Sequence, residues 1–145
     1  MESAQLLKFF LFSGMSEDQF DNIIPFMAEE EYSADDIIIK EGKINDKIFF
    51  IIRGQVSVIK KDTFLYNYSE GEHFGEMEVL DVIPADATIK AVTPVTAATI
   101  SNKALRAMYN TDAKTFSHIT MNLTRDLSRR LRKLGKLYTI SKQQE

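Results

Sequence analysis

Cysteine and tryptophan are absent from this 145-residue sequence, and histidine occurs only twice. Without cysteine the chain has no disulfide bond, no thiolate nucleophile and no cysteine-ligated zinc or iron–sulfur site, so packing alone must hold its core. A catalytic zinc ion binds several protein ligands, and His73 and His118 would leave much of that task to carboxylates. Disulfide scaffolds and thiol enzymes are therefore excluded, and we expect no bound metal and no cofactor.

Long hydrophobic runs are missing as well. The longest apolar stretch near the N-terminus is Leu6–Phe12, but Lys8 interrupts it and Glu2 precedes it in place of a basic region. This pattern is typical of neither a signal peptide nor a membrane span. We therefore expect a cytoplasmic protein that does not contact a membrane.

The residues that are present are typical of one globular domain. The chain is about as long as a single domain, and its 44% hydrophobic and 27% charged residues can form a core, which excludes disorder. No nucleophile elbow, metalloprotease motif or phosphate loop occurs. Glu76 and Glu78 would point to opposite faces of an extended segment, which disfavours a paired-carboxylate site. We expect a protein that is not an enzyme.

Charge is distributed unequally along the chain. The formal net charge is -3, yet the segment from Met121 to Leu137 holds six basic residues against Asp126 alone. That segment carries a balance of +5, which leaves -8 for the remainder. Two interpretations stay open: a surface for nucleic acid or an acidic partner, or the solvated face of an amphipathic helix. The second is favoured because apolar residues recur along the same segment.

A helix is expected near the N-terminus. Ser16 and Gln19 have the spacing of a capping box, in which two side chains bind amides left free at a helix start. Apolar residues then recur at helical spacing up to Met27, although Pro25 should end or kink the helix.

From Glu31 onward, short runs of β-branched and aromatic residues alternate with glycine, asparagine and aspartate. Such runs, joined by tight turns, predict antiparallel strands in a sandwich, jelly roll or barrel. His73 falls in a predicted loop and is expected at the surface. The expected strands are 37–39, 48–52, 56–60, 64–68, 87–92 and 95–100.

Two helices are expected to follow, with Ser101 and Thr111 as their N-caps and the second running to about Tyr138. Apolar residues recur in the second helix at intervals of four, four, three and four. A helix this long exceeds what a small β domain can cover, so we expect a homodimer with a short coiled coil. His118 is expected to be solvated or at the seam. The predicted seam residues are Leu123, Leu127, Leu131, Leu134 and Tyr138.

Several short motifs occur in order along nearly the whole chain: Leu11–Ser16, Tyr32–Ala34, Ile39–Gly42, Asp46, Phe49–Ile52, Gly54–Val56, Phe74–Met77 and Pro84–Ala91. This series resembles the cyclic-nucleotide-binding domains of the catabolite activator protein and of protein kinase regulatory subunits. The resemblance implies a mainly β fold with flanking helices, namely a jelly roll or double-stranded β-helix. It implies one domain over 1–145, with N-terminal helices in 1–30, the jelly roll in 31–100 and C-terminal helices in 101–145.

The resemblance also implies a phosphate-binding cassette. In that family the glutamate at the position of Glu76 accepts hydrogen bonds from the ribose 2′-hydroxyl, and an arginine neutralises the cyclic phosphate. Counted from Phe74, Ala85 occupies the arginine position and Asp86 follows it. The implied ligand-binding residues are Phe74, Gly75, Glu76, Met77, Ala85, Asp86, Ala87 and Thr88.

The two cassette departures oppose an anionic ligand, because a neutral and an acidic side chain stand where the family places a cation and a small residue. Arg125 or Arg129 could compensate if the long helix closes over the pocket. We therefore expect a regulatory or sensor domain in which binding of cyclic AMP or cyclic GMP is weakened, altered or lost. The alternative is a degenerate domain that docks an unknown protein partner. No direct DNA binding is expected, since no helix-turn-helix follows the long helix.

Overall fold

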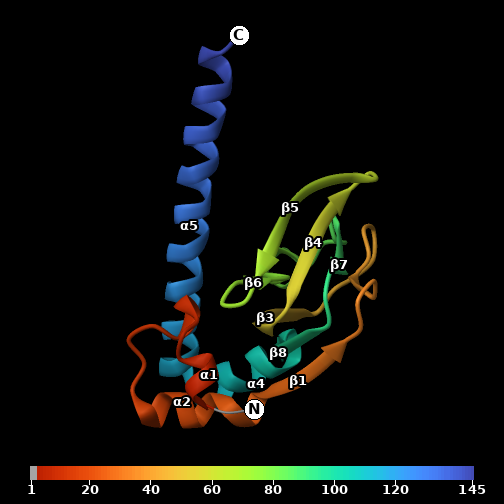
Figure 1. The fold of residues 1–145 in the computed structure, drawn as a ribbon. Coiled ribbons are helices and arrows are strands. Elements are labelled where there is room, and N and C mark those ends of the chain that lie inside the picture. The colour runs from red at the N-terminus through yellow and green to blue at the C-terminus, as the bar shows by residue number, and fades with distance from the viewer. Residues whose placement is uncertain (1–2) are drawn as a thin grey trace.

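The computed structural model describes residues 3–145, and its centre is a pair of antiparallel four-stranded sheets (Figure 1). The first sheet has the order β1 (Met27–Tyr32), β8 (Val95–Ser101), β3 (Lys47–Arg53) and β6 (His73–Phe74). The second has the order β2 (Ile37–Ile39), β7 (Thr88–Ala91), β4 (Gln55–Lys60) and β5 (Thr63–Ser69). The predicted jelly roll with flanking helices is confirmed.

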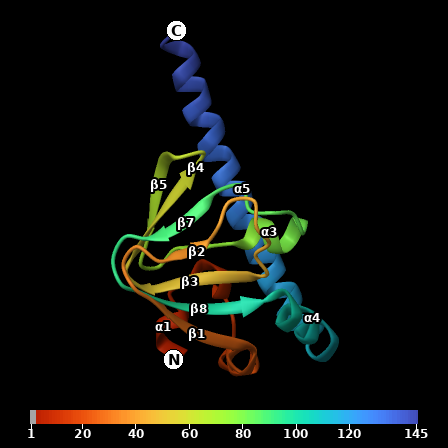
Figure 2. The same cartoon turned by 90° about the vertical axis from the view of Figure 1, so that its right-hand side faces the viewer.

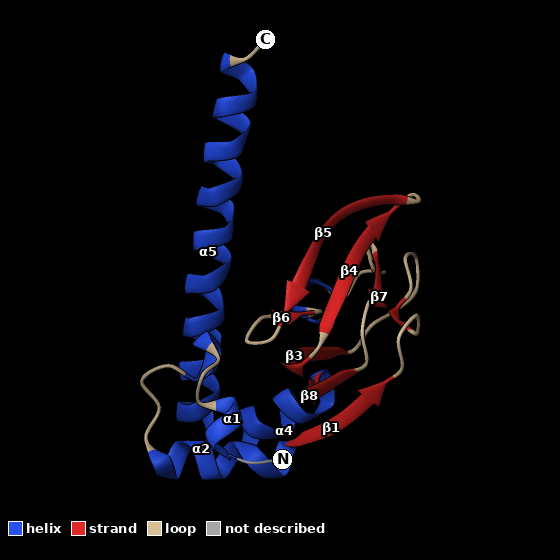
Figure 3. Ribbon diagram, viewed as in Figure 1, coloured by secondary structure: helices blue, strands red, loops and turns tan. Residues whose placement is uncertain are grey.

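Helices gather at one end of the sheets, and the last helix rises beyond them (Figures 2 and 3). The N-terminal elements are α1 (Ser3–Leu6), η1 (Phe10–Phe12), α2 (Glu17–Ile23) and η2 (Ile24–Phe26). The later ones are α3 (Glu76–Asp81), α4 (Asn102–Thr111) and α5 (Ala113–Gln143). Within residues 3–145, no helix is both long and apolar enough to cross a bilayer.

The core has two halves, and β3 belongs to both. Ile48 and Phe50 pack in a cluster with the N-terminal helices, α4 and α5. Phe49 and Ile51 point the other way, into a cluster between the two sheets. This division follows from the period of two along a strand, and it explains why β3 is a continuous apolar run rather than an alternating one.

The helix boundaries agree with local capping chemistry. Ser16 Oγ accepts from the Gln19 amide and Gln19 Oε1 accepts from the Ser16 amide, so the predicted capping box at the start of α2 is confirmed. Helix α2 ends at Ile23, and the turn containing Pro25 continues as a 3-10 helix. Ser101 caps α4 as predicted, since its hydroxyl accepts from the Ala104 amide.

Three expectations about element boundaries are wrong. Strand β1 begins at Met27, not near Glu31, because its pairing with β8 extends a segment whose helical spacing was misleading. Thr111 ends α4, and Asp112 caps α5 through its carboxylate and the Thr115 amide. The segment predicted as a loop around His73 contains the short strand β6, which pairs with β3.

The first half of α5 packs on its own domain. Leu123 is buried in the helix-side core and Leu127 packs against it, so Leu123 does not belong to a free seam as predicted. Asn122 Nδ2 donates to the carbonyls of Leu11 and Ser13, and His118 Nε2 lies 2.9 Å from the Ser13 carbonyl. His118 is thus partly exposed and contacts the Ser13 carbonyl of its own domain.

We predict that Phe50→Ala lowers the free energy of unfolding by about 3–5 kcal/mol, because Phe50 is 1% exposed and its removal leaves a cavity between β3 and the helices. Phe64→Ala is the matched control, since Phe64 on β5 is 58% exposed and should change stability by less than about 1 kcal/mol. Urea unfolding followed by circular dichroism measures both. Equal losses in the two variants would contradict the burial of Phe50 in the helix-side cluster.

Candidate ligand-binding site

A pocket of about 220 Å³ lies between β4–β5, the start of α3 and the segment that leads into β7. Its walls are apolar toward the sheet and acidic toward α3. The lining residues are Ile39, Val58, Lys60, Leu65, Tyr66, Tyr68, Phe74, Gly75, Glu76, Met77, Glu78, Asp86, Ala87 and Ile89.

Gly75 makes the turn between β6 and α3, and only glycine fits there. Its φ is 90°, in the left-handed region, which side chains disfavour. A Cβ at this position would meet the Lys47 carbonyl at 2.5 Å and Asn45 Nδ2 at 2.9 Å. The close approach to β3 lets α3 begin directly at the pocket, with Glu76 as its first residue.

Glu76 is a buried carboxylate, only 2% exposed. Its Oε1 accepts from Arg130 Nη1 at 2.8 Å, whereas Oε2 accepts no hydrogen bond from any described residue. Burial raises the pKa of Glu76, and the nearby guanidinium of Arg130 opposes that rise. Glu76 lines the pocket, but its Oε2 is buried, and burial makes the lack of a hydrogen-bond donor to this oxygen unfavourable.

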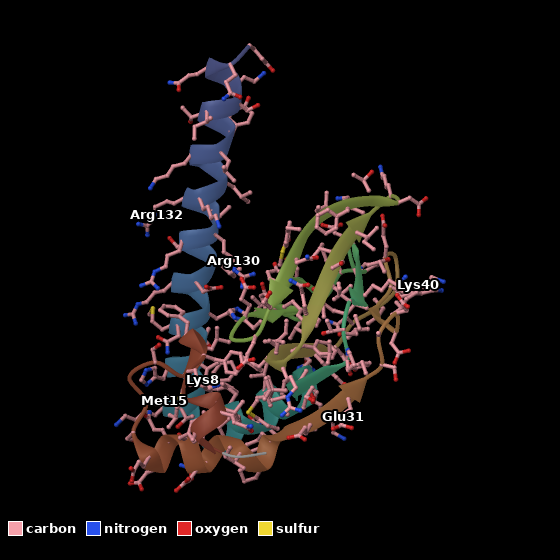
Figure 4. The ribbon with its side chains drawn as sticks, viewed as in Figure 1. Lys8, Met15, Glu31, Lys40, Arg130 and Arg132 are labelled. Carbon is pink, nitrogen blue, oxygen red and sulfur yellow. The ribbon has the colours of Figure 1, made fainter. Side chains whose placement is uncertain are left out.

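Arg130 reaches this site from α5, and Figure 4 shows it pointing toward the sheets while Arg132 points to the other side of the helix. Nη1 donates to Glu76 and, at 3.4 Å, to the Tyr68 hydroxyl. Nη2 lies 3.2 Å from His73 Nε2 and donates to the His73 carbonyl at 3.3 Å. Nε lies 2.9 Å from Asp126 Oδ2 as an ion pair. Every nitrogen of the guanidinium therefore has a partner.

His73 is buried in β6, so the expectation of a surface histidine is wrong. Its Nε2 lies 3.2 Å from Asp126 Oδ2 as well as close to Arg130. Burial lowers the pKa of His73 to about 4, and the positive charge of Arg130 acts in the same direction. The ring is neutral near pH 7, where Nε2 can either donate to Asp126 or accept from Arg130.

Six of the eight residues expected to bind a ligand line the pocket: Phe74, Gly75, Glu76, Met77, Asp86 and Ala87. The other two lie behind its wall. Ala85 is buried in the inter-sheet core, and its amide and carbonyl bind the Lys43 carbonyl and the Gly42 amide, each at 2.8 Å. Thr88 Oγ1 accepts from the Glu41 amide. Both therefore hold the wall of the pocket together.

The expectation that Glu78 and Glu76 point to opposite faces of an extended segment is wrong, because both residues lie in the first turn of α3 and both line the pocket. The sequence also did not indicate that Lys60, Tyr66 and Tyr68 would line it. The alternation of side chains in these segments predicted strands β4 and β5, but it did not indicate which face of the strands would meet α3.

Arg130 is a further residue of the site that the sequence did not indicate. Arg125 and Arg129 were the expected helix cations, but the Arg125 guanidinium bonds to Asn122 and that of Arg129 lies 4.3 Å from the centre of the Phe10 ring. A usable signal was the spacing of Asp126 and Arg130, because residues four apart share one face of a helix.

Residues 29–112 match the family model described as "Cyclic nucleotide-binding domain", which is more than half of the chain. The chain belongs to this family. A cyclic-AMP-dependent protein kinase regulatory subunit from Blastocladiella emersonii is 30% identical over an alignment of 87 residues that covers 57% of this chain. The matched part of the chain spans only 22% of that relative's length.

Solved structures of related domains have the same fold as this chain. A cyclic nucleotide-binding domain from Methylobacillus flagellatus aligns with a TM-score of 0.83 at 23% identity, covering 90% of this chain and 79% of that one. A regulatory subunit of a cyclic-AMP-independent protein kinase A from Trypanosoma cruzi, bound to guanosine, aligns with a TM-score of 0.65 at 25% identity. That match covers 72% of this chain and 38% of the other.

We predict that Arg130→Gln lowers the free energy of unfolding by about 2 kcal/mol, because it leaves the buried Glu76 carboxylate without its charged partner. Adding Glu76→Gln should recover most of the loss, since the orphaned charge is then removed. The measurement is urea unfolding of the two single variants and the double variant, with Arg132→Gln as the control on the solvated side of α5. Additive losses in the double variant would contradict an energetic link between the two residues.

Proposed function

We propose that this domain is a non-catalytic regulatory module whose pocket senses a small ligand and holds cyclic nucleotides only weakly. The observation that carries the proposal is the composition of the pocket where the family resemblance expects a phosphate. The family resemblance implies that Ala85 stands at the position of the arginine; Ala85 is buried behind the wall, and Asp86 beside it lines the pocket.

The energetic consequence follows from charge. An arginine–phosphate hydrogen bond contributes about 1.5–3 kcal/mol, so its loss weakens binding by about tenfold to a hundredfold. Asp86 adds a negative charge to the wall that would face the phosphate, which is a repulsion in place of an attraction. Ala85 and Asp86 therefore both weaken binding of a phosphate.

Arg130 does not supply the missing cation. Its terminal nitrogens already bind Glu76, Tyr68 and His73, and its Nε faces Asp126. A phosphate would have to take one of these donors away and leave a buried carboxylate or carbonyl without a partner. Lys60 is the remaining cation among the lining residues.

A ligand without a phosphate group avoids this penalty. The similar structure from Trypanosoma cruzi is bound to guanosine, a nucleoside, at 25% identity to this chain. That neighbour supports the proposal that a pocket of this fold accepts such ligands, and we extend it to this domain.

The contact between Glu76 and Arg130 offers a route by which occupancy reaches α5. In the resembling family the equivalent glutamate accepts from a ribose hydroxyl, so a ligand that engages Glu76 changes the partners of Arg130. The ligand then favours one arrangement of α5 over another by its difference in affinity for the two. Movement of this helix is the proposed output.

We predict by isothermal titration calorimetry that cyclic AMP and cyclic GMP bind no tighter than the high micromolar range. The variant Asp86→Ala removes the repulsion without adding volume and should gain about tenfold in affinity. Ala85→Arg with Asp86→Ala should gain more, provided that thermal melts show the double variant folded around the buried position of Ala85. Submicromolar binding by the unmodified protein would contradict the proposal, and complete absence of ligand binding would favour the partner-docking alternative.

We also propose that two copies of the chain associate through the far half of α5. Leu131, Leu134 and Tyr138 are 69%, 62% and 66% exposed, and with Leu127 they recur at intervals of four, three and four. This is the heptad spacing of a coiled-coil seam. The helix is already anchored by its first half, so less conformational entropy is lost when the second half pairs.

The charged residues of α5 fit this arrangement. With Leu131 and Tyr138 at heptad position a, the cations Arg129, Arg132 and Lys133 lie at outer positions, away from the seam. Gly135 flanks the seam, and a Cβ there would meet nothing within 4 Å. Glycine inside a helix lowers helix stability by about 1 kcal/mol relative to alanine, and no contact within the described residues requires a glycine at this position. The absent side chain leaves room for a facing helix.

Light scattering on a size-exclusion column should give about twice the 16.6 kDa mass of one chain. Leu131→Lys with Leu134→Lys should yield a monomer, because buried lysines in a seam are strongly unfavourable. The control Lys133→Ala with Lys136→Ala changes outer positions and should remain dimeric. A monomer at tens of micromolar for the unmodified chain would contradict the seam.

A further inference from the structure

The pocket is lined by more acids than cations. Glu76, Glu78 and Asp86 contribute three carboxylates to its walls, and Lys60 contributes one ammonium group. Arg130 pairs with Glu76 and with Asp126, so the carboxylates of Glu78 and Asp86 remain against the one ammonium group of Lys60. An ionised carboxylate accepts hydrogen bonds and donates none. The charged part of the wall is therefore suited to hydrogen-bond donors and not to an anion.

Glu76 supplies independent evidence that a donor is missing. The residue lines the pocket, it is 2% exposed, and its Oε2 accepts no hydrogen bond from the described residues. A buried acceptor without a donor is unfavourable by the loss of its hydration. This oxygen has almost no accessible surface, so a ligand hydroxyl would reach it when the Glu76 side chain turns toward the pocket and changes its contact with Arg130.

A cyclic nucleotide and the corresponding nucleoside differ in the charge and in the hydrogen-bond donors that they present to such a wall. A cyclic 3′,5′-phosphate presents oxygens that carry negative charge and only accept. A free ribonucleoside has 2′-, 3′- and 5′-hydroxyls, each with one hydrogen to donate. Replacing the phosphate by two hydroxyls thus turns a like-charge contact with Asp86 into a charge-assisted hydrogen bond.

The opposite wall fits a planar base. Leu65, Tyr66 and Tyr68 of β5 line it, and the rings of Tyr66 and Tyr68 meet edge to face with centroids 5.2 Å apart. Tyr66 is half exposed, so its ring can pack against a ligand. The volume of about 220 Å³ lies below the roughly 300–1,000 Å³ of pockets for drug-sized ligands, which favours a small molecule.

We infer that the pocket binds a ribonucleoside with free hydroxyls in preference to the corresponding cyclic nucleotide, with Asp86 and Glu78 accepting from the 3′- and 5′-hydroxyls and Glu76 from the 2′-hydroxyl. Asp86 is the specificity-determining residue, since it is the carboxylate next to the position of the family's arginine. This inference rests on the proposed function and names the ligand class for the same site.

The experiment is calorimetry on the full chain with adenosine, guanosine, cyclic AMP and cyclic GMP, together with 2′-deoxyadenosine and 5′-deoxyadenosine. At least one nucleoside should bind about tenfold tighter than its own cyclic phosphate. For adenosine, loss of either the 2′- or the 5′-hydroxyl should weaken binding by about tenfold, because each loss leaves a carboxylate oxygen without its donor.

Two isosteric variants test the role of Asp86. Asp86→Asn removes the charge in the pocket and should weaken nucleoside binding by about five- to tenfold while strengthening cyclic nucleotide binding. Asp81→Asn is the matched control, because Asp81 is an exposed aspartate at the end of α3 that does not line the pocket. The control should change either affinity by less than about twofold.

The outcomes separate this inference from the proposed function. Tight binding of a cyclic nucleotide, stronger than that of its nucleoside, would overturn both. Weak cyclic nucleotide binding with no nucleoside binding up to millimolar concentration would overturn the inference alone. Equal effects of Asp86→Asn and Asp81→Asn would overturn the assignment of Asp86 as the residue that sets the preference.

Discussion

The structure depends on one charge pair, in which the partly exposed Arg130 of α5 neutralises the buried Glu76 at the start of α3. A buried carboxylate is strongly unfavourable without a partner, so the position of Glu76 constrains where α5 can lie. The turn at Gly75 brings that carboxylate to the pocket wall, since no side chain fits between it and β3. Ligand site and long helix are therefore linked by the same two residues.

Arg130 joins α5 to three other elements around the pocket. Arg130 contacts β5 through Tyr68, β6 through His73 and α3 through Glu76, while Asp126 holds it from its own helix. A change in any of these partners alters the forces on α5. The proposed transmission from the pocket to the helix would run through these contacts.

Much of the fold could be predicted from local patterns. The capping box at Ser16 and the β-branched runs of β2 to β5 were recognisable because they depend on neighbours within a few residues. Strand β1 and strand β6 were not, because pairing with β8 and β3 decides their conformation against weak or opposite local preference. Of the candidate site, the cassette on either side of α3 was recognisable from its motif, whereas the strand residues Tyr66 and Tyr68 were not.

The family resemblance and the jelly roll could be predicted from the sequence alone, since both follow from the identity and order of residues along the chain. The contact of Arg130 with Glu76, the burial of His73 and the place of Leu123 in the core became known only from the folded structure. The reason is that the rotation of a helix and the face of a strand are set by contacts between elements distant in the chain. Small shifts in either would present different side chains to the same pocket.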